Sequence, residues 1–374
     1  MTIARRWGLT LTAAALTAAI GCGAGSAGVD YSRWDGTRGI SAGPDLRVRW
    51  SKLLAAEFNG PYVPVERAVA AFDPLRERIY IGSSQHYLWA FNDQGKAIYR
   101  REFESAIEAE PTLAASRDEL YVATAGGRVH ALRASDGSER FNIDIGAAVS
   151  QPGVLSEDAL YLVTDGDGVY AISRKDGSTL WRYQRDPRAG LKVSGHAGLL
   201  SSDQRLITGF SDGSIVALAK GDGHALWVVD TTPVQVGDMV YAASFLGGLY
   251  GLRVQDGVAQ FRHAELTTIT SLAADERSLL VASAERGVIC YDLPTMTTRW
   301  IKHEYLRGAP NNIVVNGRTA YVTETRGALL ALTLAEGREI GRIQTEHGFT
   351  ATPSLFDGRG FIMNNAGVFY AFIY

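Results

Sequence analysis

Cysteine is almost missing from this chain of 374 residues, which has only Cys22 and Cys290. Two cysteines can form neither a disulfide framework nor a zinc site built on thiolates. Cys290 falls in the apolar segment 288–291, so we expect it to be a small buried hydrophobic residue. The seven histidines show no i, i+2 or i, i+4 spacing, so the sequence predicts no metal site and no cofactor.

A charge excess of one sign is missing as well. The 37 basic and 40 acidic residues give a formal net charge of -3, and no run of five like charges occurs. Nucleic-acid-binding proteins usually carry a basic excess or a basic stripe, so we expect no nucleic-acid partner. Apolar spacing of the kind i, i+3, i+4, i+7 is also absent, which argues against a helical fold.

The N-terminal apolar stretch is too short to cross a membrane. Residues 7–20 form an uncharged segment of 14 residues after Arg5 and Arg6, whereas a transmembrane helix needs about 20. We therefore predict a signal peptide over residues 1–21. Its end, Ala-Ile-Gly-Cys at 19–22, resembles the bacterial lipobox and predicts lipid attachment at Cys22. The alternative is an ordinary signal peptide with an incidental cysteine. Residues 22–44 are expected to be a flexible tether.

A repeat fills the rest of the chain, residues 45–374. Each unit has an aromatic or aliphatic anchor, a small residue ten positions later, and in most units an aromatic residue near position twenty. Turns rich in glycine, several of them Asp-Gly pairs typical of hairpins, separate the apolar segments. The eight anchors are Tyr80, Tyr121, Tyr161, Ile207, Tyr241, Leu280, Tyr321 and Phe361.

The spacing of the anchors predicts the fold. Successive anchors lie 34 to 46 residues apart, and a period near 40 is typical of propeller blades with four strands each. The last unit ends at Tyr374 without its fourth strand, and residues 46–51 resemble the missing one. We therefore predict an all-β, eight-bladed propeller of four-stranded antiparallel blades, closed by the N-terminal strand.

The repeat resembles that of the pyrroloquinoline-quinone (PQQ)-type propellers, a superfamily that includes quinoprotein dehydrogenases and the BamB family. The signal peptide, the blade number, the length and the segment Asp-Thr-Thr-Pro-Val at 230–234 are similar to the BamB family. That resemblance implies a non-enzymatic scaffold lipoprotein of the machinery that assembles β-barrels in the outer membrane. It also implies an outer-membrane anchor, a periplasmic location in a Gram-negative bacterium, and binding to the periplasmic domains of BamA.

The resemblance also implies which residues meet the partner. The family's Leu-x-Leu-Arg loop matches Leu191, Lys192, Val193 and Ser194, and its acidic pair before Thr-Thr-Pro keeps Asp230 but has Val228 in place of the other acid. Because exposed ion pairs contribute little, we expect the apolar residues of the loop to carry the contact. The alternative is that these are ordinary loop residues. Free sheet edges are a further expected site for nascent outer-membrane proteins, by strand addition.

Other functions are also possible interpretations of this sequence. A propeller of another envelope complex would bind a different periplasmic ligand or protein. A PQQ-dependent dehydrogenase needs calcium ligands and usually a vicinal cysteine pair, and no such pair exists. The segments 209–213 and 165–168 match a nucleophile elbow and a calcium loop in part, but both fall where the repeat predicts a hairpin turn.

The junction before the fifth unit is unusually short. Only five residues separate Trp227 from Pro233, whereas crossing a blade takes about 14 Å, or at least four extended residues. The sequence therefore predicts that the strand holding Trp227 stops at that residue, and that the partner surface shifts with it.

Overall fold

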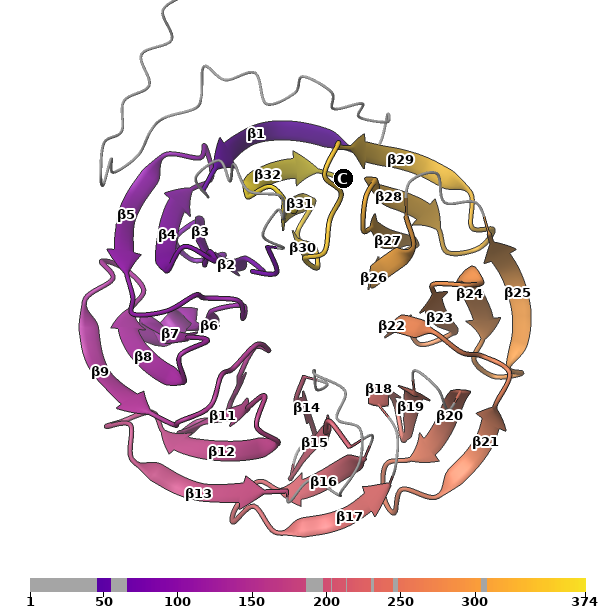
Figure 1. The fold of residues 1–374 in the computed structure, drawn as a ribbon, viewed down its shortest axis with the longest axis horizontal. Helices are drawn as coiled ribbons and strands as arrows, with labels where there is room; N and C mark the ends of the chain where they lie inside the picture. The colour runs from indigo at the N-terminus through magenta and orange to yellow at the C-terminus, as the bar shows by residue number, and fades with distance from the viewer. Residues whose placement is uncertain are drawn as a thin grey trace, which may run out of the picture.

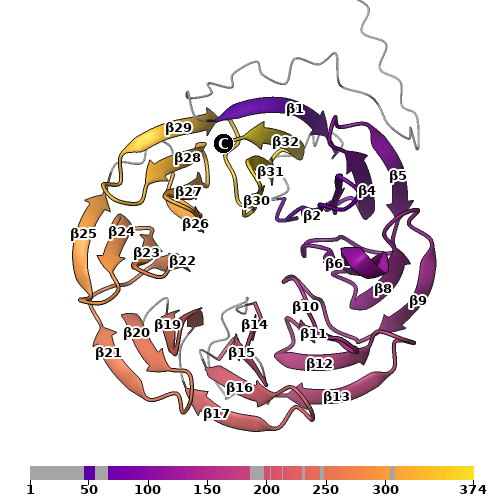
Figure 2. The same cartoon turned by 180° about the vertical axis from the view of Figure 1, so that it is seen from behind.

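The computed structural model describes residues 46–54, 66–185, 198–202, 204–212, 214–229, 232–244, 248–303 and 308–374. These residues form eight antiparallel sheets of four strands, arranged as blades around a central axis (Figure 1). Figure 2 shows the same ring from its other face. The eight-bladed propeller predicted from the repeat is therefore confirmed.

Each blade is a meander that starts at the axis and ends at the rim. The innermost strands are β2 (Ala71–Asp73), β6 (Thr112–Ala114), β10 (Val154–Leu155), β14 (Leu200–Ser201), β18 (Thr232–Val236), β22 (Ile269–Ala274), β26 (Pro310–Asn316) and β30 (Ser354–Phe356). The second strands are β3 (Arg78–Ile81), β7 (Glu119–Ala123), β11 (Ala159–Val163), β15 (Arg205–Gly209), β19 (Met239–Ser244), β23 (Ser278–Ser283), β27 (Thr319–Glu324) and β31 (Arg359–Met363).

The third and outermost strands complete the blades. The third strands are β4 (Tyr87–Asn92), β8 (Arg128–Arg133), β12 (Gly168–Ser173), β16 (Ile215–Ala219), β20 (Gly248–Arg253), β24 (Gly287–Asp292), β28 (Ala328–Thr333) and β32 (Val368–Ile373). The outermost strands are β5 (Ala97–Glu102), β9 (Glu139–Asp144), β13 (Thr179–Gln184), β17 (Ala225–Val229), β21 (Ala259–His263), β25 (Thr297–Lys302), β29 (Glu339–Gln344) and β1 (Arg47–Leu53). A 3-10 turn, Ala115–Arg117, lies between β6 and β7.

The repeat offsets are the register of the sheets. In the third blade, β10–β13, Tyr161 pairs with Ala171, and Ala171 pairs with Trp181. The small residue in the third strand leaves room between two large neighbours, so one row of side chains crosses the blade. The other blades repeat this row, as the equal spacing in the sequence requires.

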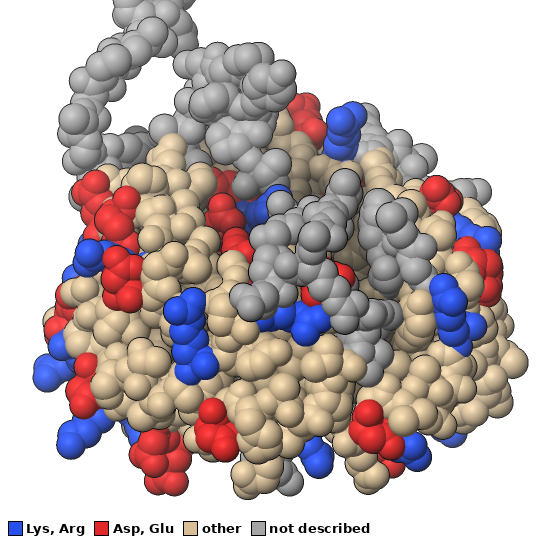
Figure 3. All heavy atoms as spheres, turned by 60° about the horizontal axis from the view of Figure 1, so that its bottom comes forward, with Lys and Arg blue, Asp and Glu red and all other residues tan. Residues whose placement is uncertain are grey.

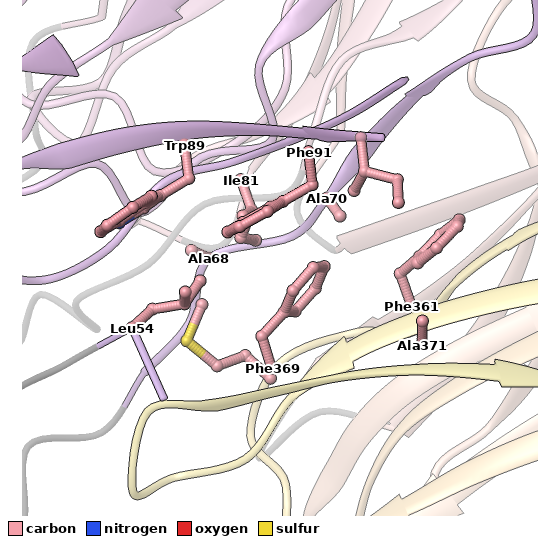
Figure 4. Close-up of a cluster of buried hydrophobic side chains, with 11 residues drawn as sticks. Leu54, Ala68, Ala70, Ile81, Trp89, Phe91, Phe361, Phe369 and Ala371 are labelled. Atoms are coloured by element: carbon pink, nitrogen blue, oxygen red, sulfur yellow. The ribbon is translucent and has the colours of Figure 1, made fainter. Parts of the chain in front are cut away.

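The second and third strands hold most of the core. Strands such as β7 and β23 are buried along their whole length, because blades cover both of their faces. Figure 4 shows one such layer between the first and eighth blades, where Trp89 and Phe91 of β4 face Phe361 and Phe369. Cys290 lies in an equivalent layer and is fully buried, as the sequence predicts.

The N-terminal strand closes the ring. β1 pairs antiparallel with β32, and Trp50 lies opposite Ala371. The eighth blade therefore combines the first described strand with the last three, which pairs an edge of β32 that would otherwise be open. The sequence prediction of closure is confirmed.

Candidate functional site

The residues predicted to carry lipid or to meet a partner lie outside the described parts of the chain. They are Cys22, Leu191, Lys192, Val193, Ser194 and Asp230. The structure does describe the residues at which the two partner segments begin and end. Residues 186–197 connect β13 to β14, and residues 230–231 connect β17 to β18. Both segments therefore flank the same sheet, the fourth blade, β14–β17.

The topology places both connections on the same face of the ring. In an antiparallel meander, the chain enters the innermost strand on one face and returns to that face after the second strand. The turn between β15 and β16 is therefore on the face where residues 186–197 and 230–231 begin. A direct contact agrees with this arrangement, because Arg185 donates from Nε to Asp212 Oδ2 over 2.7 Å.

This ion pair fixes the start of the segment 186–197. The side chains of Arg185 and Asp212 are only 13% and 7% exposed. Burial alone would raise the pKa of Asp212, but hydrogen bonds from Ser214 and Arg185 outweigh it and lower that pKa. The carboxylate therefore stays charged and holds Arg185 against the turn. At the other end of the segment, Leu199 is buried among residues of the third and fourth blades.

A second carboxylate ties the third blade to the same turn. Asp167, in the turn between β11 and β12, accepts hydrogen bonds from the backbone N–H of Ser211 at 2.8 Å and from its hydroxyl at 2.5 Å. Asp167 is almost completely buried. Segment 165–168 links β11 to β12, and the described residues 209–212 lead from β15 toward β16, so a strand follows each of them. The nucleophile-elbow and calcium-loop alternatives lack the strand-turn-helix and helix-loop-helix contexts that those motifs need.

The prediction of a strand ending at Trp227 is wrong. β17 continues to Val229, and residues 228 and 229 pair with Val216 and Ile215 of β16. Stopping at Trp227 would leave those backbone groups of β16 without ladder partners, which is costly. β17 therefore runs two residues past its aromatic residue, as β21 and β25 do, and one residue less than β5, β9 and β13.

Cys290, the free cysteine that the structure describes, is a poor nucleophile and a poor metal ligand. Burial raises the pKa of the Cys290 thiol to about 11, so the thiolate that a nucleophile or metal ligand requires is disfavoured. In the described part of the chain, no three His, Cys, Asp or Glu side chains gather as metal ligands. Likewise, none of its helices is long and apolar enough to cross a membrane.

Two polar clusters that involve the second blade were not predicted from the sequence. Glu119 of β7 accepts hydrogen bonds from Arg174, beyond β12, and from the Tyr121 hydroxyl. His130 of β8 lies between two carboxylates, with Glu104 Oε2 at 3.1 Å and Glu139 Oε2 at 3.0 Å. Ring packing brings Glu119 of the second blade to Arg174 of the third, whereas His130 and Glu139 lie on adjacent strands of one blade. A comparison of equivalent positions between blades is the signal that could have found them.

Comparisons with known proteins agree with this architecture. The family described as outer membrane protein assembly factor BamB matches residues 84–302 and 229–342. The outer membrane protein assembly factor BamB of Shewanella oneidensis is 21% identical over 394 aligned positions, which cover 97% of this chain and 98% of the relative.

Two solved structures share the fold. The crystal structure of BamB from Moraxella catarrhalis superposes with a TM-score of 0.72 at 20% identity, covering 88% of this chain and 100% of that chain. The quinohemoprotein alcohol dehydrogenase of Comamonas testosteroni superposes with a TM-score of 0.66 at 13% identity, covering 88% of this chain and 76% of that chain. At these sequence identities the superpositions show a shared fold and not a shared function, because proteins of one fold can have several functions.

Proposed function

Because the chain belongs to the BamB family of outer membrane protein assembly factors, we propose that it is a non-enzymatic scaffold that binds the periplasmic domains of BamA. Its relatives are named as assembly factors rather than enzymes. The observation that supports the proposal is where the two predicted partner segments join the described strands. Residues 186–197 and 230–231 flank one blade and start from the same face.

Rigid anchors on that face favour a binding role. Arg185 and Asp212 form a buried ion pair at the start of one segment, and Asp167 holds the neighbouring turn. A loop whose ends are fixed loses less conformational freedom when a partner binds. The described residues at the two ends of the segment that contains Leu191 and Val193 are thus held in place before a partner binds.

Apolar contact would supply most of the affinity. We propose Leu191 and Val193 as the apolar anchors of the site, and Lys192, Ser194 and Asp230 as its polar residues. Truncating a buried apolar anchor at an interface often costs about 2 kcal/mol, whereas an exposed ion pair contributes roughly 0 to 1 kcal/mol. Loss of the family's arginine at Ser194 is therefore compatible with binding.

Co-purification from detergent-solubilised membranes tests this function. The tagged protein is the bait, and mass spectrometry identifies what it retains. We expect the unmodified protein to retain BamA and the double variant Leu191→Asp, Val193→Asp to lose it. Leu75→Asp is the matched control, because Leu75 is 67% exposed in a turn on the opposite face. Enrichment of a different envelope complex, with BamA absent, would contradict the proposal.

The membrane anchor is proposed to be a lipid on Cys22, which would hold the propeller at the inner leaflet of the outer membrane, facing the periplasm. Metabolic labelling with palmitate, combined with membrane fractionation, checks it. We expect Cys22→Ser to lose the label and to leave the membrane fraction. A variant that keeps its label would point to a different attachment residue.

A further inference from the structure

The eight outermost strands provide an internal comparison. Each outermost strand has a central residue that pairs with the repeat's small residue in the third strand. One residue comes directly before this central residue and one directly after it. We call these two neighbours the flanking pair. The pairs are Ile98 and Arg100, Arg140 and Asn142, Leu180 and Arg182, Leu226 and Val228, Gln260 and Arg262, Arg299 and Ile301, Ile340 and Arg342, and Arg49 and Ser51.

Seven of these flanking pairs contain an arginine, and the pair in β17 contains none. Charged side chains on an edge strand oppose the addition of another strand, because the added strand would bury them. Leu226 and Val228 are instead apolar, and they are 41% and 43% exposed. β17 is therefore the outermost strand that lacks the usual protection.

β17 also has an edge available for hydrogen bonding. It pairs with β16 on one side, and no described strand pairs with its other side. In Figure 1 it lies on the rim of the ring, between β13 and β21. Figure 3 brings this side of the molecule forward and shows broad uncharged areas between scattered charges. The outer edge of β17 thus combines exposed apolar side chains with backbone N–H and C=O groups that pair with no described strand. An added strand needs both for binding.

The neighbouring strands indicate the charge of the occupant. β13 carries Arg182 and β21 carries Arg262 at the position that Val228 occupies in β17. An apolar strip between two basic positions complements a strand that is apolar in its middle and uncharged or acidic at its ends. A strand with basic ends would be repelled.

We propose that the outer edge of β17 binds an extended segment of a client outer-membrane protein, which adds to the fourth blade as a fifth strand. The choice of client rests on the proposed function, since strands of outer-membrane barrels alternate apolar and polar side chains. Alternate apolar side chains would lie against Leu226 and Val228 while the backbones pair.

Peptide binding tests the proposal. The probe is a fluorescent peptide that alternates valine and threonine, has acidic ends and is long enough to pair with the whole of β17. Fluorescence anisotropy measures its affinity for the full chain. We expect the double variant Leu226→Arg, Val228→Arg to bind it about tenfold more weakly. The control is Leu180→Arg, because Leu180 is 53% exposed on β13, where an arginine is already present.

Two altered peptides test the mode of binding. A central proline removes a backbone donor, so this peptide should not bind, and lysine ends should weaken binding at low salt. Equal affinity of the original peptide for the β17 variant and the unmodified protein would overturn the proposal. So would a protein that binds no peptide but self-associates in sedimentation until β17 is changed, because the occupant would then be a second copy.

The same variants separate this inference from the proposed function. We expect the β17 variant to retain BamA in co-purification, and Leu191→Asp, Val193→Asp to retain peptide binding. One outcome would overturn the β17 site alone and leave the scaffold function supported. In that outcome Leu191→Asp, Val193→Asp loses BamA, and the β17 variant binds the peptide as tightly as the unmodified protein does.

Discussion

Trp181 donates its indole N–H to the backbone carbonyl of Lys220 in the next blade, over 2.9 Å. The tryptophan on an outermost strand is therefore bonded to the following blade as well as packed in its own. Three other tryptophans repeat the bond with distances of 2.8 to 3.0 Å, Trp50 to Asp93, Trp227 to Val254 and Trp300 to Leu334. These bonds connect successive blades around the rim.

Gly223 should be intolerant of a side chain because of this contact. Its φ is +75°, and an added Cβ would lie 2.4 Å from Cε3 of Trp181. Both the left-handed backbone and the overlap disfavour alanine. We expect Gly223→Ala to lower the free energy of unfolding by roughly 2 to 4 kcal/mol, measured by chemical denaturation. Gly221→Ala is the control in the same turn, because nothing lies within 4 Å of its added Cβ. Equal effects of the two changes would contradict this explanation.

Trp50 should be important for closing the ring. It packs against Phe91 and Phe369, with ring centroids 6.0 and 5.7 Å away, and donates to the carbonyl of Asp93. We expect Trp50→Ala to lower the free energy of unfolding by roughly 3 kcal/mol and to expose β1 to limited proteolysis. Trp50→Phe keeps an aromatic ring but loses the hydrogen bond, so it should cost about 1 kcal/mol. An unchanged proteolysis pattern in Trp50→Ala would show that β1 closes the ring without this contact.

The fold could be predicted because the residue spacing of the repeat determines which residues pair between neighbouring strands. The spacing from Tyr161 to Ala171 and Trp181 appears in the sheet as direct cross-strand pairs. A two-residue side-chain period leaves little freedom once one face of a strand is buried. In the sixth blade Met296 stands where most blades have a glycine, and its φ of +52° shows that methionine adopts the left-handed conformation that glycine supplies elsewhere.

The candidate site could be predicted only in part, for two physical reasons. Ring packing decides which blades share a contact, so the pair formed by Arg185 and Asp212 has no spacing signal in the sequence. The end of β17 was predicted wrongly because the estimate considered the length of the connection and neglected the backbone groups of β16. The partner residues from Leu191 to Ser194 stay a prediction, since they lie outside the described residues.

Glu119 should stabilise the contact between the second and third blades. Burial alone would raise its pKa, but hydrogen bonds from Arg174 and Tyr121 outweigh burial and lower it. Removing one member of a buried ion pair leaves the other charge uncompensated. At neutral pH we therefore expect Glu119→Gln to lower the free energy of unfolding by roughly 3 kcal/mol, measured by urea denaturation.

The pH dependence of that difference has a definite sign. Because the pKa of Glu119 is lower in the folded state, its stabilisation is present above the ordinary glutamate pKa and is lost as the pH falls below it. The difference in the free energy of unfolding between Glu119→Gln and the unmodified protein should therefore become smaller at acidic pH. Glu336→Gln is the control, since Glu336 is 73% exposed and 3.9 Å from Arg338, and it should have little effect at any pH. A difference that stays constant in acid would mean that packing, not charge, explains the loss.

Glu110 should make the protein less stable as the pH rises from the ordinary glutamate pKa to neutrality. It lines a pocket together with Val129, Leu162 and Gln151, and burial raises its pKa to about 7. Between the ordinary glutamate pKa and pH 7, the folded state therefore binds more protons than the unfolded state, so stability falls as the pH increases. We expect Glu110→Gln to remove this slope and to gain roughly 2 to 4 kcal/mol relative to the unmodified protein at pH 8. Urea denaturation from pH 5 to 8 measures both curves, and parallel curves would show that the carboxyl of Glu110 is not the group that titrates.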